Sequence, residues 1–213
     1  MREKGGVHLT GTDVRILEFL LENVTKEFSI NKISEAIGIS YPPVRERMLE
    51  LRRRGIIKVR EINPTQSLCS ADTKNSDNIS VFSYVEFLRK EKFLSVKKEL
   101  KTIAGDILGR ITGNSFTMIL FGSHAKGREA PSSDIDILFL MSSAGDEGMI
   151  TKAVATAERL TNRKIHTINM MYNDFFESLK KDSANLSNEV LENHIIIYGS
   201  EAFYRSLVIH GQI

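Results

Sequence analysis

The sequence predicts two domains of different fold class, a helical N-terminal domain that ends in β-structure and a C-terminal α/β (α+β) domain. Three observations lead to this expectation. The length of 213 residues allows one to two domains. Apolar residues recur at helical spacing before residue 55, whereas strand-like apolar runs appear after residue 115. Finally, the two ends of the chain carry opposite net charge.

The whole-chain composition hides this difference in charge. With 41% hydrophobic and 26% charged residues and a net charge of +2, the chain has ordinary globular composition, which argues against extensive disorder. Residues 1–65 carry 12 basic and 9 acidic side chains, whereas residues 116–213 carry 9 basic and 12 acidic ones. The largest local excess, seven basic against two acidic residues, lies at 45–60. Such asymmetry is typical of a nucleic-acid-binding part joined to something else.

Other features of the composition indicate the compartment. Cys69 is the single cysteine, so the chain has no internal disulfide, which fits a reducing environment. The first six residues lack the apolar core of a signal peptide. No apolar run approaches the roughly 20 residues that span a bilayer. We therefore expect a soluble, cytoplasmic protein without a membrane partner.

The first 65 residues predict three helices and a strand. Apolar periodicity and N-cap residues place helices that begin at Thr10, Ser29 and Ser40. The second helix ends at Gly38 and the third at Gly55, since glycine readily adopts the left-handed conformation that ends many helices. The segment 56–62 alternates enough to form a strand. Helix, helix, short turn, capped helix and strand is the order of a winged helix-turn-helix domain.

The third helix and the following strand resemble those of prokaryotic winged-helix regulators, and the resemblance covers residues 9–65. It implies contact with double-stranded DNA, in which Tyr41, Arg45 and Arg47 reach base edges or phosphates. The remaining basic residues would steer the domain to the DNA backbone: Arg52, Arg53, Arg54, Lys58 and Arg60. Regulators of this class commonly bind as homodimers. The alternative is that these arginines form a solvated face and that the domain contacts proteins.

Residues 66–94 are expected to be a linker and a connecting helix between the winged-helix domain at 1–65 and a second domain at 95–213. Polar, turn-rich stretches follow residue 62, and a helical pattern then runs over residues 79–111.

The chemistry of the chain is concentrated around two strands of the second domain. The strand 115–121 runs into Gly122 and Ser123, and a second strand follows at 133–141. Because side chains alternate along a strand, Asp134 and Asp136 project to the same face. Neighbouring carboxylates repel unless a cation lies between them, and such a pair suits Mg²⁺.

The loop between these strands suits a polyphosphate. Backbone amides and the hydroxyl at Gly122 and Ser123 are placed to cradle phosphate oxygens. Lys126 and Arg128 in the same loop would neutralise a triphosphate. Metal and polyphosphate are therefore expected on adjacent strands.

The stretch from Phe121 to Leu138 closely resembles the signature of the DNA polymerase β-like nucleotidyltransferase superfamily, especially its small "minimal" prokaryotic members. The likeness covers about residues 95–205. It implies a mixed sheet flanked by helices that binds an NTP such as ATP with Mg²⁺ (or Mn²⁺) and transfers the nucleotidyl group to a hydroxyl. In that picture Gly122 and Ser123 hold the triphosphate, Asp134 and Asp136 ligate the metal, and Ser133 supports the turn or a phosphate.

The sequence departs from this family at the third carboxylate, which lies on the following strand. The corresponding segment, 165–172, offers Asn169, which adds no charge and is no general base. Three hypotheses follow: an active transferase brought to its acceptor by the winged helix, a transcriptional regulator whose second domain senses nucleotides or dimerises, and a partner that neutralises a helical toxin.

Overall fold

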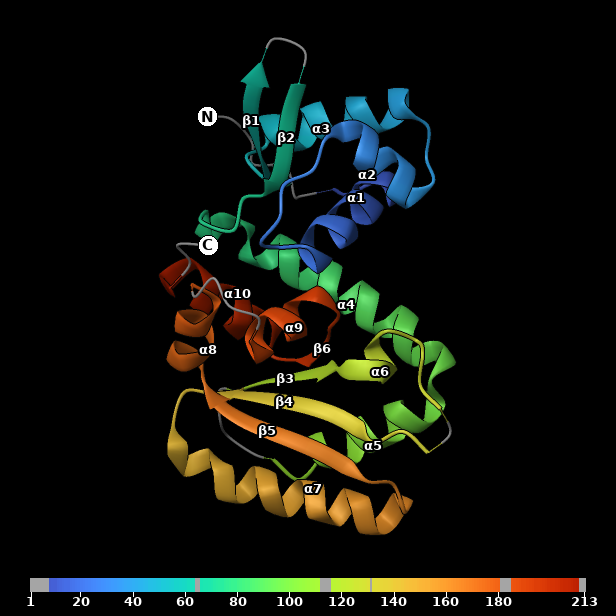
Figure 1. The fold of residues 1–213 in the computed structure, drawn as a ribbon, viewed down its shortest axis with the longest axis vertical. Coiled ribbons are helices and arrows are strands. Elements are labelled where there is room, and N and C mark those ends of the chain that lie inside the picture. The colour runs from blue at the N-terminus through green and yellow to red at the C-terminus, as the bar shows by residue number, and fades with distance from the viewer. Residues whose placement is uncertain (1–7, 64–65, 112–115, 131, 181–184, 211–213) are drawn as a thin grey trace. The chain divides into compact units, whose positions relative to one another are not determined.

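The computed structural model describes residues 8–63, 66–111, 116–130, 132–180 and 185–210. The chain divides into two compact units, Met1–Val85 and Glu86–Ile213 (Figure 1). This division falls inside the segment 66–94 that the sequence assigns to a linker and connecting helix. Within the described residues, every helix is too short or too polar to cross a membrane.

The helices of the first unit are α1 (Gly11–Glu22), α2 (Ile30–Ile37) and α3 (Tyr41–Arg53). Thr10 and Asp13 form a reciprocal capping box, in which each side chain accepts a bond from the other residue's backbone amide. The Ser29 hydroxyl caps α2 by accepting from the amide of Lys32 at 3.3 Å. Ser40 occupies the N-cap position of α3 but makes no side-chain capping bond. Two prolines in the first turn of α3 reduce the need for one.

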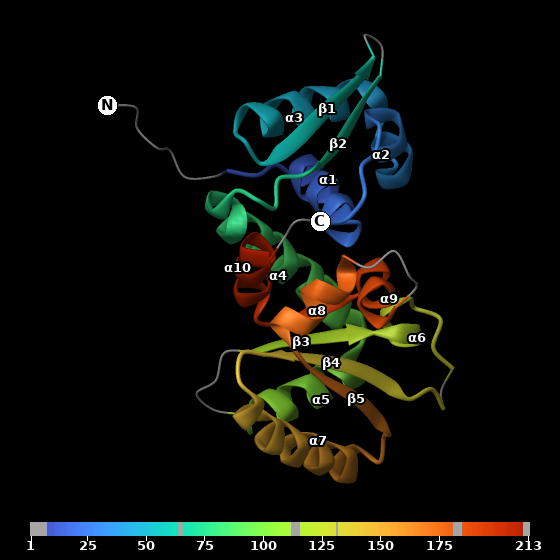
Figure 2. The same ribbon diagram turned by 60° about the vertical axis from the view of Figure 1, so that its left-hand side comes forward.

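A β-hairpin completes the first unit (Figure 2). Strand β1 (Ile57–Asn63) pairs antiparallel with β2 (Gln66–Ala71). Cys69 of β2 also bridges to Phe28, with backbone bonds of 2.8 and 2.9 Å, which ties the hairpin to the segment before α2. Strand β2 therefore belongs to the wing, although the sequence places residues 66–71 in the linker. The polar residues of β2 resemble those of a loop in the sequence. In the structure they belong to a strand whose buried residues are Cys69 and Ala71.

The second unit is built on a four-stranded mixed sheet, which confirms the fold class implied by the resemblance. Its strands are β3 (Phe116–Phe121), β4 (Ile135–Met141), β5 (Ile165–Met171) and β6 (Ile195–Tyr198). The order across the sheet is β5-β4-β3-β6. Strands β4 and β5 run parallel, and β3 is antiparallel to both of its neighbours.

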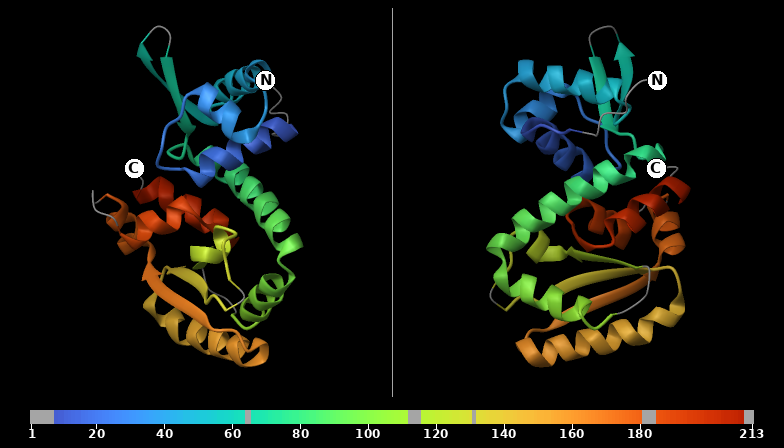
Figure 3. Two further views of the ribbon diagram at one scale, coloured as in Figure 1. Left: turned by 45° about the vertical axis from the view of Figure 1, so that its right-hand side comes forward. Right: turned by 180° about the vertical axis from the view of Figure 1, so that it is seen from behind.

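Helices cover both faces of this sheet. Helices α5 (Lys98–Leu108) and α7 (Glu147–Thr161) lie on one face, as the view from behind in Figure 3 shows. They pack on alternate residues of β4, among them Ile135, Ile137 and Phe139. The other face carries α8 (Tyr172–Leu179), α9 (Leu186–Glu192) and α10 (Ser200–His210). Short 3₁₀ turns at Ser76–Asn78 and Ala144–Asp146 precede α4 and α7.

Helix α4 (Ile79–Val96) contributes residues to both compact units, and its second half is fixed in the second unit by buried polar side chains. Glu86 accepts a hydrogen bond from the Tyr204 hydroxyl at 2.9 Å and pairs with Arg89 at 3.2 Å. Arg89 also donates to the backbone carbonyl of His194. Because all four residues are buried, these bonds compensate the cost of removing polar groups from water.

The buried histidine in this network makes the stability of the second unit depend on pH. Burial, and next the nearby Arg89 cation, lower the pKa of His194 to about 3. In the unfolded chain histidine has a pKa of about 6.5, so between these values only the unfolded chain binds the proton. The contribution of His194 is therefore complete above about pH 6.5 and is lost as the pH falls toward 3. Between about pH 7.5 and pH 5 we expect it to lower the free energy of unfolding by about 2 kcal/mol.

Urea unfolding of wild type and His194→Gln at both pH values checks this expectation. The variant should lose this part of the pH dependence, whereas His8→Gln, at an exposed histidine, should keep it. Equal pH dependence in wild type and His194→Gln would contradict the assignment.

Candidate functional site

One edge of the mixed sheet brings the predicted phosphate loop and the two aspartates together. Strand β3 ends at Phe121, which pairs with Asp136 near the start of β4. Gly122 and Ser123 then begin the short helix α6 (Gly122–Ala125) directly beyond this pair. The antiparallel register therefore places the Gly-Ser turn beside the carboxylate at position 136, as a site for metal and phosphate requires.

Gly122 is the residue on which this approach depends. Its φ is +69°, in the left-handed region, and a Cβ at this position would overlap Oδ2 of Asp136. The backbone conformation therefore favours glycine, and a Cβ here would have to displace the Asp136 carboxylate. The turn and the second aspartate form one local structure.

Two basic side chains face the two aspartates from the neighbouring strand. Nζ of Lys164, the residue before β5, lies 2.8 Å from Oδ2 of Asp134. Nδ1 of His166 lies 3.2 Å from Oδ1 of Asp136, its direct partner in the parallel pairing. The hydrogen bond to Asp134 raises the pKa of Lys164. Neither base is among the site residues predicted from the sequence, although positions 164 and 166 alternate in step with 134 and 136.

The position assigned to Asn169 is corrected by the strand register. Asn169 pairs with Phe139, three positions along the strand from Asp136, and an odd offset places it on the opposite face of the sheet. Its amide lies 3.4 Å from Glu147 of α7. The residue beside Asp136 on β5 is His166, so a histidine and not an asparagine occupies the place expected for the third carboxylate.

The other predicted phosphate residues lie along the loop between β3 and β4. Lys126 lies 3.9 Å from Glu189 of α9, and Arg128 is exposed. The Ser133 hydroxyl accepts from the amide of Ala130 at 2.9 Å, which supports the turn before Asp134. Both cations are thus accessible to an anionic ligand, whereas Ser133 is already engaged.

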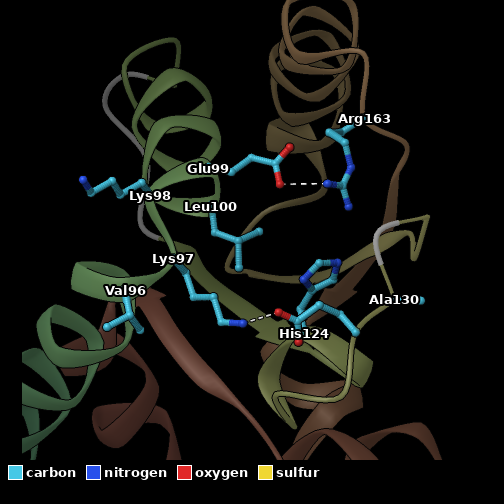
Figure 4. Close-up of a pocket in the computed structure, with 9 residues that line it drawn as sticks. Val96, Lys97, Lys98, Glu99, Leu100, His124, Ala130 and Arg163 are labelled. Atoms are coloured by element: carbon cyan, nitrogen blue, oxygen red, sulfur yellow. Dashed lines mark hydrogen bonds and ion pairs between the residues drawn. The ribbon is translucent and has the colours of Figure 1, made fainter.

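Two side chains, Arg163 and His124, support the loop between β3 and β4. Both border a cavity of about 360 Å³ (Figure 4). Arg163 donates to the Ser133 carbonyl at 2.9 Å, and Nε2 of the buried His124 lies 3.4 Å from the same oxygen. Arg163 also pairs with Glu99 at 2.7 Å. These contacts fix the backbone of the residue that precedes Asp134.

The two aspartates at this edge suit a divalent ion only when a nucleotide binds with it. Among the described residues, no three His, Cys, Asp or Glu side chains are grouped closely enough to hold a metal. Two carboxylates are sufficient for Mg²⁺ when phosphate oxygens and water complete its shell. Asp134 and Asp136 thus fit the magnesium complex of an NTP, but each is paired with a base from the β5 segment.

Polar side chains from three elements of the first unit surround a small hollow at the start of α3. Tyr41, with 43% of its surface exposed, lies there with residues that we did not predict. The hollow, of about 260 Å³, is also lined by Ser29, Ile30, Asn31, Gln66 and Ser67. Gln66 and Ser67 reach this hollow because β2 pairs with β1.

Arg47 differs from the other predicted DNA-contacting residues, because it forms a buried ion pair. Its guanidinium donates to both carboxylate oxygens of Asp13, at 2.8 and 2.7 Å, and Asp13 is completely buried. Burial by itself raises the pKa of Asp13, but the bonds from Arg47 and Thr10 outweigh it and lower that pKa. Arg47 therefore joins α3 to the start of α1, and its guanidinium is engaged by Asp13, unlike those of the other predicted DNA-contacting arginines.

The remaining basic residues of α3 and β1 stay available. Arg45 is exposed. The other four lie in solvent-accessible ion pairs: Arg52 with Glu61 at 4.0 Å, Arg53 with Glu50 at 2.6 Å, Lys58 with Asp72 at 2.9 Å, and Arg60 with Glu27. Exposed pairs of this kind contribute about 0–1 kcal/mol, so phosphates can replace the carboxylates.

Helix α3 with its wing, and the Gly-Ser turn with its aspartate pair, define a winged-helix module followed by a nucleotidyltransferase fold. Residues 9–58 match the family described as winged helix-turn-helix DNA-binding, and residues 114–202 match the family described as polymerase beta, nucleotidyltransferase. The chain therefore carries a polymerase β-type nucleotidyltransferase domain C-terminal to a winged helix-turn-helix domain. Searches of curated proteins and of solved structures gave no significant match.

Gly122→Ala tests whether the turn and Asp136 depend on each other. Gly127 provides a matched control, since its φ is +63° but a Cβ there would meet open space. Alanine in the left-handed region costs about 1–2 kcal/mol, so Gly127→Ala should lose about that much stability. Gly122→Ala should lose more and should also weaken NTP binding at least about ten-fold, as measured by calorimetry. Equal effects of the two substitutions on binding would contradict the argument.

Arg47→Ala and Arg45→Ala should separate folding from DNA contact. Removing Arg47 leaves a buried carboxylate unpaired, so we expect a loss of about 3 kcal/mol in thermal unfolding. Arg45→Ala should leave stability within about 0.5 kcal/mol of wild type and reduce the salt dependence of DNA binding. Wild-type stability of Arg47→Ala with weakened DNA binding would restore Arg47 as a contact residue.

Proposed function

We propose that the chain binds an NTP as its Mg²⁺ or Mn²⁺ complex, transfers the nucleotidyl group to a hydroxyl acceptor, and is brought to DNA by its winged helix. The observation that carries this proposal is the contact between Gly122 and Asp136. A turn in the left-handed conformation that favours glycine lies directly against the second carboxylate of an Asp-x-Asp pair. A backbone turn suited to phosphate thus lies beside a carboxylate suited to a metal, and this supports the proposal.

The residues of the loop act on the triphosphate by position and charge. The amides and hydroxyl of Gly122 and Ser123 hold phosphate oxygens, and Lys126 and Arg128 reduce the repulsion between them. Asp134 and Asp136 hold the metal. When bound, that ion neutralises charge on the attacking and leaving oxygens.

Transfer by this site should be slow. His166, and no acid, lies beside Asp136 on β5, so we expect no carboxylate from this strand to assist the attacking hydroxyl. An imidazole supplies no negative charge to a metal ion, so we expect transfer to be slower than with a third carboxylate.

The histidine beside Asp136 also favours a second function, a DNA-binding regulator whose second domain senses nucleotides. In this alternative the winged helix binds double-stranded DNA through Tyr41, Arg45, Arg52, Arg53 and Lys58, as a monomer or as a homodimer. Nucleotide binding then changes DNA affinity without chemistry.

Transfer of labelled nucleotide in the presence of Mg²⁺ or Mn²⁺ tests the proposal. We expect weak transfer by wild type and a loss of at least about 100-fold in Asp134→Ala and Asp136→Ala, since both metal ligands are needed. His166→Asp restores an acid beside Asp136 and should raise the rate at least about ten-fold.

The controls for this experiment use the same preparations. Each variant should unfold at the wild-type temperature within a few degrees, which shows that lost activity is not lost folding. If wild type is no better than Asp134→Ala with all four NTPs and several acceptors, and His166→Asp is equally inactive, transfer is excluded. A change in DNA affinity on adding NTP would then establish the regulator.

A further inference from the structure

Strands β4 and β5 present acids and bases at matched positions. Asp134 and Asp136 are two residues apart and share a face, as do Lys164 and His166. Each base contacts one acid, at 2.8 Å for Lys164 and 3.2 Å for His166. The alternation of both strands and their parallel register therefore fix two pairs side by side.

These pairs oppose the binding of a free divalent cation. A metal that bridges the aspartates must compete with the Lys164 ammonium for Asp134 and with the Nδ1–H of His166 for Asp136. An ammonium group about 4 Å from a doubly charged ion lowers its affinity by at least about ten-fold, even in water. Without a compensating anion, the aspartates accordingly remain with their protein partners.

A triphosphate changes this balance. The Lys164 side chain is 75% exposed, so it can turn from Asp134 to a phosphate without leaving a buried charge unpaired. Lys126 and Arg128 on the loop are also accessible. The phosphates attract all three cations, and movement of Lys164 toward a phosphate releases Asp134.

We propose that Lys164 and His166 keep the aspartate pair free of metal until a triphosphate arrives, so that the site takes up the divalent ion only together with the nucleotide. The inference rests on the proposed function, because it concerns the same nucleotide site. It assigns Lys164 two positions: against Asp134 without nucleotide, and against phosphate with it.

The full-length chain tests the inference with Mn²⁺ as a spectroscopic probe of the metal, independently of activity. Electron paramagnetic resonance should show weak Mn²⁺ binding to wild type without nucleotide. Lys164→Met removes the competing charge and should bind Mn²⁺ at least about ten-fold more tightly. Lys152→Met, at an exposed lysine of α7, is the matched control and should bind as wild type does.

The second measurement is calorimetry with a non-hydrolysable NTP and EDTA. Wild type should bind the nucleotide without metal, and Lys164→Met should bind it at least about five-fold more weakly, since a phosphate contact is lost. Equal Mn²⁺ affinity of wild type and Lys164→Met without nucleotide would overturn the inference, as would equal affinity of the two proteins for the nucleotide. Failure of every variant to bind NTP with or without metal would instead overturn the proposed function, whatever the Mn²⁺ result.

Discussion

The position of β4 between β3 and β5 is the constraint on which the candidate site depends. Its antiparallel pairing with β3 brings the Gly122 turn onto Asp136, and its parallel pairing with β5 brings His166 to the same carboxylate. Helices α5 and α7 bury the opposite face of the strand. Because a shift of one residue would turn Asp136 toward this core, the register and the chemistry cannot vary independently.

Acid–base pairs have different roles in the two units because their solvent exposure differs. The Asp13–Arg47 pair is buried on the acid side and bidentate, so it holds helices together. The Lys164–Asp134 pair is exposed and makes a single contact, so a ligand can exchange either partner. Burial thus distinguishes a structural ion pair from an adjustable one, although both look alike in the sequence.

Local signals were sufficient for much of the fold. The cap at Thr10, the left-handed Gly38 and the Asp-x-Asp strand were all predicted from neighbouring residues. The features that the sequence did not predict depend on contacts between residues that are far apart in the chain. Asp13 and Arg47 are 34 residues apart, and the choice between Asn169 and His166 depends on the register of β5 against β4. Strand β2 was not predicted because Gln66, Ser67 and Ser70 resemble loop residues.

The capping box of α1 has a consequence for how this winged helix can diversify. Asp13 caps the helix, receives two bonds from Thr10 and holds Arg47, so a single carboxylate is shared by the start of α1 and the middle of α3. Substitution at any of the three residues disturbs the other two. Side chains outside this cluster, such as the exposed Tyr41 and Arg45 that we propose as DNA contacts, can therefore vary without disturbing the packing of α1 against α3.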